Sequence, residues 1–137
     1  MQEVFVDTDV TLDLLSQRKP FYTYAAKLFS AAEKRDIKIF VTSLSFSNLN
    51  YILSKQYSAV PTREILRKLK LIVNVLSVTD KEIDLALASD FKDFEDAIQY
   101  FSAIDNGIGI IITRNLVDYQ IASIPVMTAE QYIVSTS

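Results

Sequence analysis

Carboxylates, hydroxyls and amides are concentrated in four short segments of the chain, at residues 7–9, 42–43, 93–96 and 113–118. Three of them, 7–9, 42–43 and 113–118, come directly after apolar runs that have the composition of buried strands. The fourth lies at the start of a predicted helix. Oxygen atoms of these side chains are the ligands that hard cations prefer. These are therefore the segments in which a hydrolytic or metal-binding site would be built.

The composition removes several classes of mechanism. The 137 residues include no cysteine and no histidine, which excludes disulfides, a thiolate nucleophile, a Cys/His zinc site and a histidine general base. The only glycines, Gly107 and Gly109, are too few for a P-loop or a dinucleotide-binding turn. Any bound metal must be held by oxygen, which favours Mg²⁺ or Mn²⁺. The net charge of −3 confines any contact with RNA to one face.

The sequence does not indicate the same role for every acid. Asp7 ends a run that is expected to be buried, where a carboxylate must be hydrogen-bonded, paired or bound to a cation, so we interpret it as a site residue. Asp9 fits either an N-cap of the following helix or a site residue. Asp93 and Asp96 share a helix face, yet their spacing alone favours a cap followed by an acidic first turn.

Apolar periodicity predicts strands that alternate with helices. The expected strands are residues 4–6, 37–41, 75–78, 108–112 and 124–127. The expected helices begin near residue 10 and cover 21–35, 44–57, 61–73, 80–88, 93–105 and 128–134. This order predicts an α/β fold with a parallel sheet of about five strands covered on both sides, and a single domain over residues 1–137. Ligands of such sheets bind beyond the carboxyl ends of the strands.

No apolar run approaches the roughly 20 residues that a membrane span needs. The chain also opens without the cationic and apolar regions of a secretory leader. We therefore expect a cytoplasmic protein with no membrane contact.

Five segments together resemble the PIN domain family, and the resemblance covers essentially the full chain. They are Val-Phe-Val-Asp-Thr-Asp-Val (4–10), Val-Thr-Ser-Leu-Ser-Phe-Ser-Asn-Leu (41–49), Asp-Phe-Glu-Asp-Ala-Ile-Gln-Tyr (93–100), Ile-Ile-Ile-Thr-Arg-Asn-Leu-Val-Asp-Tyr (110–119) and Ile-Pro-Val-Met-Thr-Ala-Glu-Gln-Tyr (124–132). The most specific part runs from Asp93 to Tyr132. The resemblance implies a three-layer α/β/α fold and a metal-dependent endoribonuclease, a class that includes VapC-like toxins of toxin–antitoxin pairs.

The resemblance also implies a set of site residues. The family holds Mg²⁺ or Mn²⁺ with four acids, of which Asp7 matches the first and Asp96 the third. The second falls on Asn48 and the fourth on Asn115, two departures that remove charge and weaken metal binding. The resemblance thus implies catalytic positions at Asp7, Asn48, Asp96 and Asn115.

Neighbouring residues complete the site that the resemblance implies. Charge near the metal would come from Asp118, which we include among its ligands with Asp7 and Asp96, and from Asp9 and Asp93. Substrate contacts would come from Thr8, Thr113 and Arg114, of which the arginine would bind a phosphate oxygen. The implied partners are RNA, an antitoxin protein and a second copy of the chain in a homodimer.

Three other interpretations remain open at this point. The two asparagines are compatible with a PIN fold that has lost catalysis and binds RNA or protein. The segment 7–11, Asp-Thr-Asp-Val-Thr, also matches the opening motif of haloacid-dehalogenase-like phosphatases, but no late Lys and acidic pair accompany it. A phosphoacceptor receiver domain would need a Lys after the last strand, where the chain has none.

Overall fold

The computed structural model describes residues 1–136, and its centre is a five-stranded parallel sheet. The strands are β1 (Gln2–Val6), β2 (Ile37–Thr42), β3 (Val73–Leu76), β4 (Ile111–Ile112) and β5 (Val126–Met127). Their order across the sheet is β3-β2-β1-β4-β5, and every neighbouring pair is parallel. The predicted α/β class and the five-stranded parallel sheet are confirmed.

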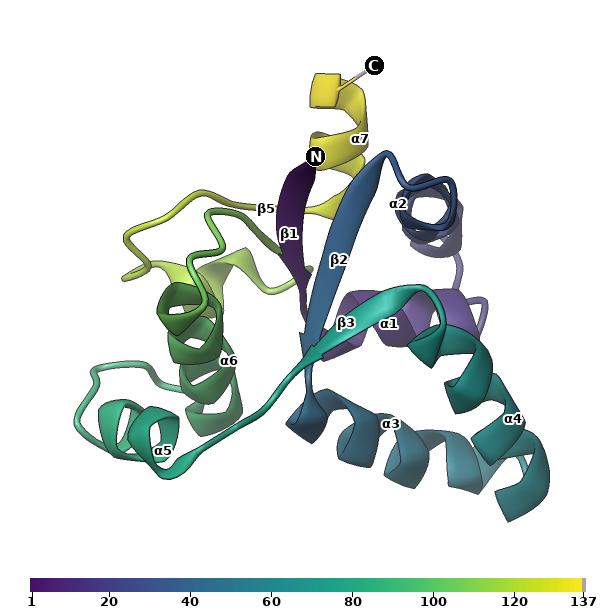
Figure 1. Cartoon of the computed structure of the whole chain (residues 1–137), viewed down its shortest axis with the longest axis horizontal. Coiled ribbons are helices and arrows are strands. Elements are labelled where there is room, and N and C mark those ends of the chain that lie inside the picture. The colour runs from purple at the N-terminus through teal and green to yellow at the C-terminus, as the bar shows by residue number, and fades with distance from the viewer. Residues whose placement is uncertain (137) are drawn as a thin grey trace.

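Helices cover both faces of this sheet. They are α1 (Thr8–Leu15), α2 (Tyr22–Glu33), α3 (Ser43–Gln56), α4 (Ala59–Lys70), α5 (Asp80–Leu87), α6 (Phe94–Asp105), the 3₁₀ helix η1 (Leu116–Tyr119) and α7 (Ala129–Thr136). Figure 1 shows α5 and α6 on one side of the strands and α1 to α4 on the other. This is the predicted three-layer arrangement. No helix within residues 1–136 is long and apolar enough to span a bilayer.

β1 is buried on both faces because its side chains alternate between two cores. Val4 and Val6 pack with the cluster formed by α1, α2, α3 and α4, whereas Phe5 packs with Tyr100 and Ile111 on the α6 side. All three β1 side chains are 0 % exposed. An uninterrupted apolar run is what a central parallel strand requires.

The strand order changes direction at β1, and this places the polar segments together. β2 lies on one side of β1 and β4 on the other, so the chain has its topological switch point at the carboxyl ends of β1 and β4. Val6 pairs with Ile112, which brings the next residues, Asp7 and Thr113, side by side. The register of the sheet therefore builds the site from residues more than 100 positions apart.

Several predicted boundaries were wrong: the helix expected at 61–73 is Ala59–Lys70, and the strand expected at 124–127 is only Val126–Met127. The strand expected at 75–78 is Val73–Leu76, because the helix before it ends at Lys70 in a tight turn and Val73 already pairs with Ile39. The strand expected at 108–112 is only Ile111–Ile112, because the Ile108 N–H donates to the Ala103 carbonyl and completes the end of α6. Gly107, with φ +70°, closes that helix as predicted.

The core of the α3 layer supplies a test of this packing. Leu49 is 0 % exposed, whereas Ile52 on the same helix is 36 % exposed. We expect Leu49→Ala to lower the free energy of unfolding by about 2–5 kcal/mol, because it removes buried methyl groups and leaves a cavity. Ile52→Ala should change it by only about 0.5 kcal/mol. Urea denaturation measures both, and equal losses would contradict the α3 orientation.

Candidate functional site

The Asp7 carboxylate is the centre of a buried hydrogen-bond network. Asp7 is the N-cap of α1, and its side chain is 3 % exposed. Its Oδ1 accepts the Thr8 N–H and the Gln99 Nε2–H, both at 2.7 Å. Its Oδ2 accepts the Thr113 hydroxyl at 2.8 Å and the Tyr119 hydroxyl at 3.3 Å. Four donors thus satisfy a charge that would otherwise be costly to bury.

Asp96 lies beside Asp7 in the first turn of α6. Asp93 is the N-cap of that helix and accepts the Asp96 N–H at 2.9 Å, so it has the capping role that the spacing favoured. The Asp96 side chain is 6 % exposed, and its Oδ1 is 3.4 Å from the Tyr119 hydroxyl. Tyr119 therefore bridges Asp7 and Asp96, although its single proton serves one acceptor at a time.

Mutual repulsion and burial disfavour the charged forms of these acids. Burial raises the pKa of Asp96 to about 8, with further contributions from the negative charges of Asp7, Asp93 and Asp118. Burial and then the charge of Asp7 raise the pKa of Asp9 to about 7. Burial also raises the pKa of Asp7, although its hydrogen bonds oppose this effect. The site is therefore a concentration of acids with too little positive charge of its own.

Asp118 joins this group from η1. Its negative charge contributes to the raised pKa of Asp96. Of the three acids that we assigned to the metal, the structure joins Asp7 and Asp96 through the Tyr119 hydroxyl, and Asp118 lies near Asp96.

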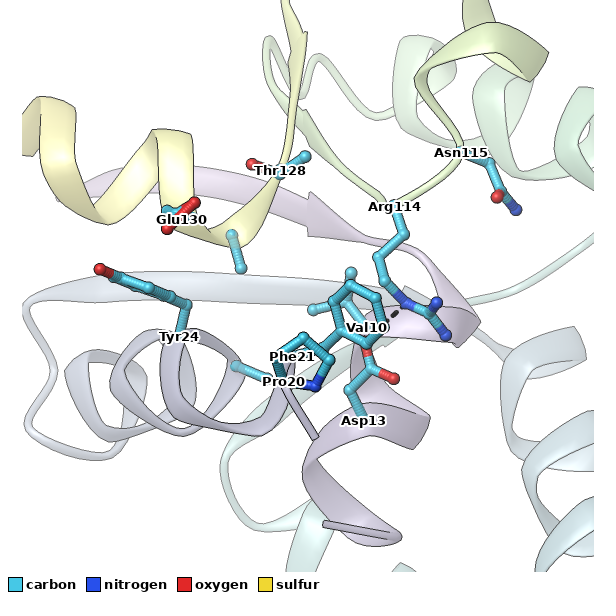
Figure 2. Close-up of a pocket in the computed structure, with 11 residues that line it drawn as sticks. Val10, Asp13, Pro20, Phe21, Tyr24, Arg114, Asn115, Thr128 and Glu130 are labelled. Carbon is cyan, nitrogen blue, oxygen red and sulfur yellow. Dashed lines mark ion pairs between the residues drawn. The ribbon is translucent and has the colours of Figure 1, made fainter. Parts of the chain in front are cut away.

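The only cation that contacts these acids within residues 1–136 is Arg114, and it is held by α1. Its backbone N–H donates to Asp9 Oδ2 at 3.1 Å, and its side-chain Nε is 2.8 Å from Asp13 Oδ2. Its guanidinium lies over the Phe21 ring, 4.1 Å from the ring centroid (Figure 2). Asp9 is not the N-cap of α1, which is Asp7, so the capping role that its position also allowed is wrong.

The two asparagines occupy different surroundings. Asn48 on α3 is half-buried, and its side chain hydrogen-bonds the carboxylate of Glu95, whose pKa is raised by burial. Asn115 is exposed, and its backbone N–H donates to Thr113 Oγ1 at 3.1 Å. Its side chain lines a pocket next to the acids, where Figure 2 shows it apart from the Asp13–Arg114 pair.

The threonines assigned to substrate contacts are buried in the network. Thr8 is 8 % exposed, and its hydroxyl is 2.8 Å from Ser45 Oγ. Ser45 in turn donates to Gln99 Oε1 at 3.2 Å. Thr113 is 0 % exposed and donates to Asp7. Both hydroxyls therefore hold the acids and their partners in position.

Sequence reasoning missed several residues of this network, namely Asp13, Ser45, Gln99 and Tyr119, and assigned no role to Glu95. Two of them carry a signal. Gln99 is three residues after Asp96, on the same face of α6, and Tyr119 follows Asp118 directly. A polar residue within an otherwise apolar helix face is a reason to look for a buried partner.

In its chemistry the donor set fits a hard cation, because it consists of crowded carboxylate oxygens whose protons a cation would replace. In its geometry it is not a closed cage. Among residues 1–136, no three acids converge closely enough to form a metal-binding group. A cation shared by Asp7 and Asp96 would have to replace the Tyr119 hydroxyl that bridges them.

The raised pKa of Asp96 has a measurable consequence for stability. In the folded chain its carboxyl group keeps a proton to a pH of about 8, whereas in the unfolded chain it loses the proton near pH 4. The folded state therefore binds more protons between these values, and the free energy of unfolding falls as the pH rises through this window. We expect the free energy of unfolding of Asp96→Asn, measured in chelator, to fall less between pH 5 and 8 than that of the wild type, by on the order of 1 kcal/mol or more.

The matched control for this experiment is Asp84→Asn, which changes an exposed acid on α5. It should leave the pH dependence of the wild type unchanged. A fall in stability that is the same in all three proteins would show that Asp96 does not hold the proton.

Comparisons with known proteins identify the family. The protein-family model of the PIN domain matches residues 3–117 of this chain. Ribonuclease VapC1 of Aquifex aeolicus (strain VF5) is 26% identical over 139 residues, which cover 96% of this chain and 93% of that protein.

Two solved structures share the fold. A DNA-bound VapBC from Salmonella typhimurium has a TM-score of 0.71 at 14% identity, over 94% of this chain and 99% of that one. A toxin–antitoxin complex from Klebsiella pneumoniae has a TM-score of 0.68 at 22% identity, over 92% and 97%. The resemblance inferred from the five sequence segments is confirmed: the chain belongs to the PIN domain family.

Proposed function

We propose that this protein is an endoribonuclease that hydrolyses phosphodiester bonds of RNA with the help of Mg²⁺ or Mn²⁺. The observation that carries the proposal is the buried pair Asp7 and Asp96, which the Tyr119 hydroxyl bridges at the switch point of the sheet, where burial and mutual repulsion favour a cation. The similarity to a relative named a ribonuclease supports the choice of reaction and substrate.

Asp7, Asp96 and Asp118 would hold the cation, which when bound would polarise a phosphate oxygen and lower the pKa of a water molecule. The protein contributes the position of these groups. Thr113 and Gln99 fix the orientation of the Asp7 carboxylate through bonds of 2.8 and 2.7 Å. In the described part of the chain the ion pair to Asp13 engages Nε of Arg114, which leaves its Nη groups for a phosphate oxygen.

The neutral Asn48 and Asn115 lower the negative charge that the site offers to a cation. We propose that metal binding is consequently weak and that Mn²⁺ is preferred. The loss of negative charge then lowers the cleavage rate more than it weakens RNA binding. Glu95, which is bonded to Asn48, supplies a carboxylate close to the position where the family has its second acid.

A second candidate function is a PIN fold that binds RNA or protein without cleaving it. The observation in its favour is that both oxygens of Asp7 already accept two hydrogen bonds each. A cation at Asp7 must compete with these donors. A haloacid-dehalogenase-like phosphatase has no such support, because the family match covers residues 3–117.

We further propose that the protein is the toxin of a toxin–antitoxin pair, that it binds an antitoxin protein, and that it forms a homodimer. The similar fold of the Klebsiella pneumoniae toxin–antitoxin complex supports the partner. A small gene next to this one that encodes a DNA-binding protein would support it independently.

Cleavage of a mixed panel of RNAs, with Mg²⁺, Mn²⁺ or chelator, tests the proposed reaction. We expect cleavage by the wild type with metal only, and a loss to the level of the chelator control in Asp7→Asn, because the amide removes the central negative charge. Asp84→Asn, which changes an exposed acid on α5, should retain full activity. No cleavage under any condition by a folded protein would favour the binding module.

Restoring the missing acid should strengthen metal binding. We expect Asn48→Glu to raise the affinity for Mn²⁺ about tenfold, the ratio that about 1.4 kcal/mol of binding energy gives, and to raise the cleavage rate. Asn50→Glu adds the same charge to an exposed position of α3 and is the control. Isothermal titration with Mn²⁺ measures both affinities, and an unchanged value for Asn48→Glu would contradict a metal site at this position.

A further inference from the structure

A cavity of about 360 Å³ opens next to the acids, between α1, the start of α2, the start of α7 and the loop after β4. Its wall includes Asp13, Pro20, Phe21, Tyr24, Arg114 and Thr128 (Figure 2). Volumes of this size are typical of sites that hold a small planar or drug-like group. None of Asp7, Asp96 and Asp118 lines it, but Arg114 and Asn115 do, so the cavity adjoins the proposed metal site and shares two of its residues.

The apolar part of the wall is aromatic and open. The Phe21 side chain is 42 % exposed although it lies in a hollow, and Tyr24 of α2 lies beside it (Figure 2). The Arg114 guanidinium lies 4.1 Å from the centroid of the Phe21 ring. Single-stranded RNA is recognised through bases that stack on aromatic rings and on guanidinium planes.

The polar part of the wall has an unused acceptor. Asp13 is 1 % exposed and pairs with Arg114 through Oδ2, but its Oδ1 has no hydrogen-bond partner among the described residues. A buried acceptor without a donor is unfavourable, and a ligand that carries N–H groups would satisfy it. Asp13 and Glu130 outnumber Arg114 among the residues that line the cavity, so the wall disfavours an acidic peptide.

One segment connects this cavity to the acid centre. Thr113 donates to Asp7 at 2.8 Å, and the next residue, Arg114, donates its N–H to Asp9 at 3.1 Å. Arg114 and Asn115 then line the cavity. On the proposed function, a ligand that occupies both places carries a phosphate next to a planar, N–H-bearing ring, which is the repeating chemistry of a polynucleotide.

We propose that this cavity is a nucleobase subsite, which seats one base of the RNA next to the phosphate that the acids attack. The inference rests on the proposed ribonuclease function and adds the element that positions the strand. The Phe21 ring and the Arg114 guanidinium that lies on one face of it together provide the stacking surface, and Asp13 both fixes Arg114 and accepts an N–H of the base. Fixing one base would help to set which phosphate reaches Asp7 and Asp96.

The test combines a protein variant with removal of single bases from the RNA. Fluorescence anisotropy is measured in chelator, which prevents metal-dependent cleavage, with the RNA of the panel that binds most tightly and with copies that have one abasic nucleotide at successive positions. We expect one abasic position to weaken binding to the wild type about tenfold, as the loss of one stacked base does. Phe21→Ala should bind the intact RNA about tenfold more weakly and should be insensitive to that abasic position.

Two further variants control the result. Phe21→Tyr keeps the aromatic ring and should keep the affinity and the sensitivity to the abasic position, which separates stacking from a loss of folding. Tyr51→Ala removes an aromatic side chain that is 61 % exposed on α3, outside the cavity, and should bind like the wild type. Thermal unfolding establishes that each variant is folded.

The outcomes separate this inference from the proposed function. Cleavage of the panel in Mn²⁺ together with equal abasic effects in wild type and Phe21→Ala would overturn the subsite and leave the ribonuclease standing. The expected coupling between Phe21 and one base without any cleavage would keep the subsite and overturn the nuclease. Absence of binding to every RNA would overturn the subsite, and the cavity would then be tested with peptides of a candidate protein partner.

Discussion

The structure depends on keeping one carboxylate, that of Asp7, in the interior of the protein. The side chain follows a fully buried strand, caps α1 and accepts hydrogen bonds from three further elements, α6, the end of β4 and η1. Each of these elements is positioned by the sheet or by its packing on the sheet. A buried charge is tolerated only when such donors are present together. The need to satisfy the Asp7 carboxylate with hydrogen bonds therefore holds Gln99, Thr113 and Tyr119 around Asp7 in the fold.

The same arrangement creates an electrostatic problem that hydrogen bonds do not remove. Burial, together with the charge of the nearby Asp7, raises the pKa values of Asp96 and Asp9 to about 8 and about 7. The cation that interacts with Asp9 is Arg114, and its Nε is paired with Asp13. Carboxylates crowded in this way are neutralised by protons or by a cation. The two candidate functions differ in which effect prevails. The hydrogen bonds that Asp7 already accepts favour the binding module, whereas the uncompensated negative charge around it favours a bound cation.

Arg114 links the acids to the neighbouring cavity. Its backbone contacts Asp9, whereas its side chain contacts Asp13 and Phe21, so one residue belongs to both places. Because Asp9 and Asp13 are one helical turn apart on α1, the orientation of that helix sets both contacts. A nuclease that binds a flexible strand needs a phosphate and a base held at a fixed separation. In the proposed nuclease, the segment after β4 would set this separation through the hydrogen bonds of Thr113 and Arg114.

The sequence by itself determined the fold class, the family and the identity of the central acid. A buried apolar run followed by Asp7 has few physical explanations, and alternating periodicities require a parallel sheet. It placed the third and fourth strands inexactly, because the apolar runs 69–78 and 108–112 contain no signal that separates a helix end from a strand start. Only the tertiary structure decided that Asp9 is not the cap, that Gln99 and Tyr119 bind Asp7, and that Asn48 faces Glu95. These contacts join residues up to 112 positions apart, and such contacts follow from strand order and register, which local sequence patterns do not encode.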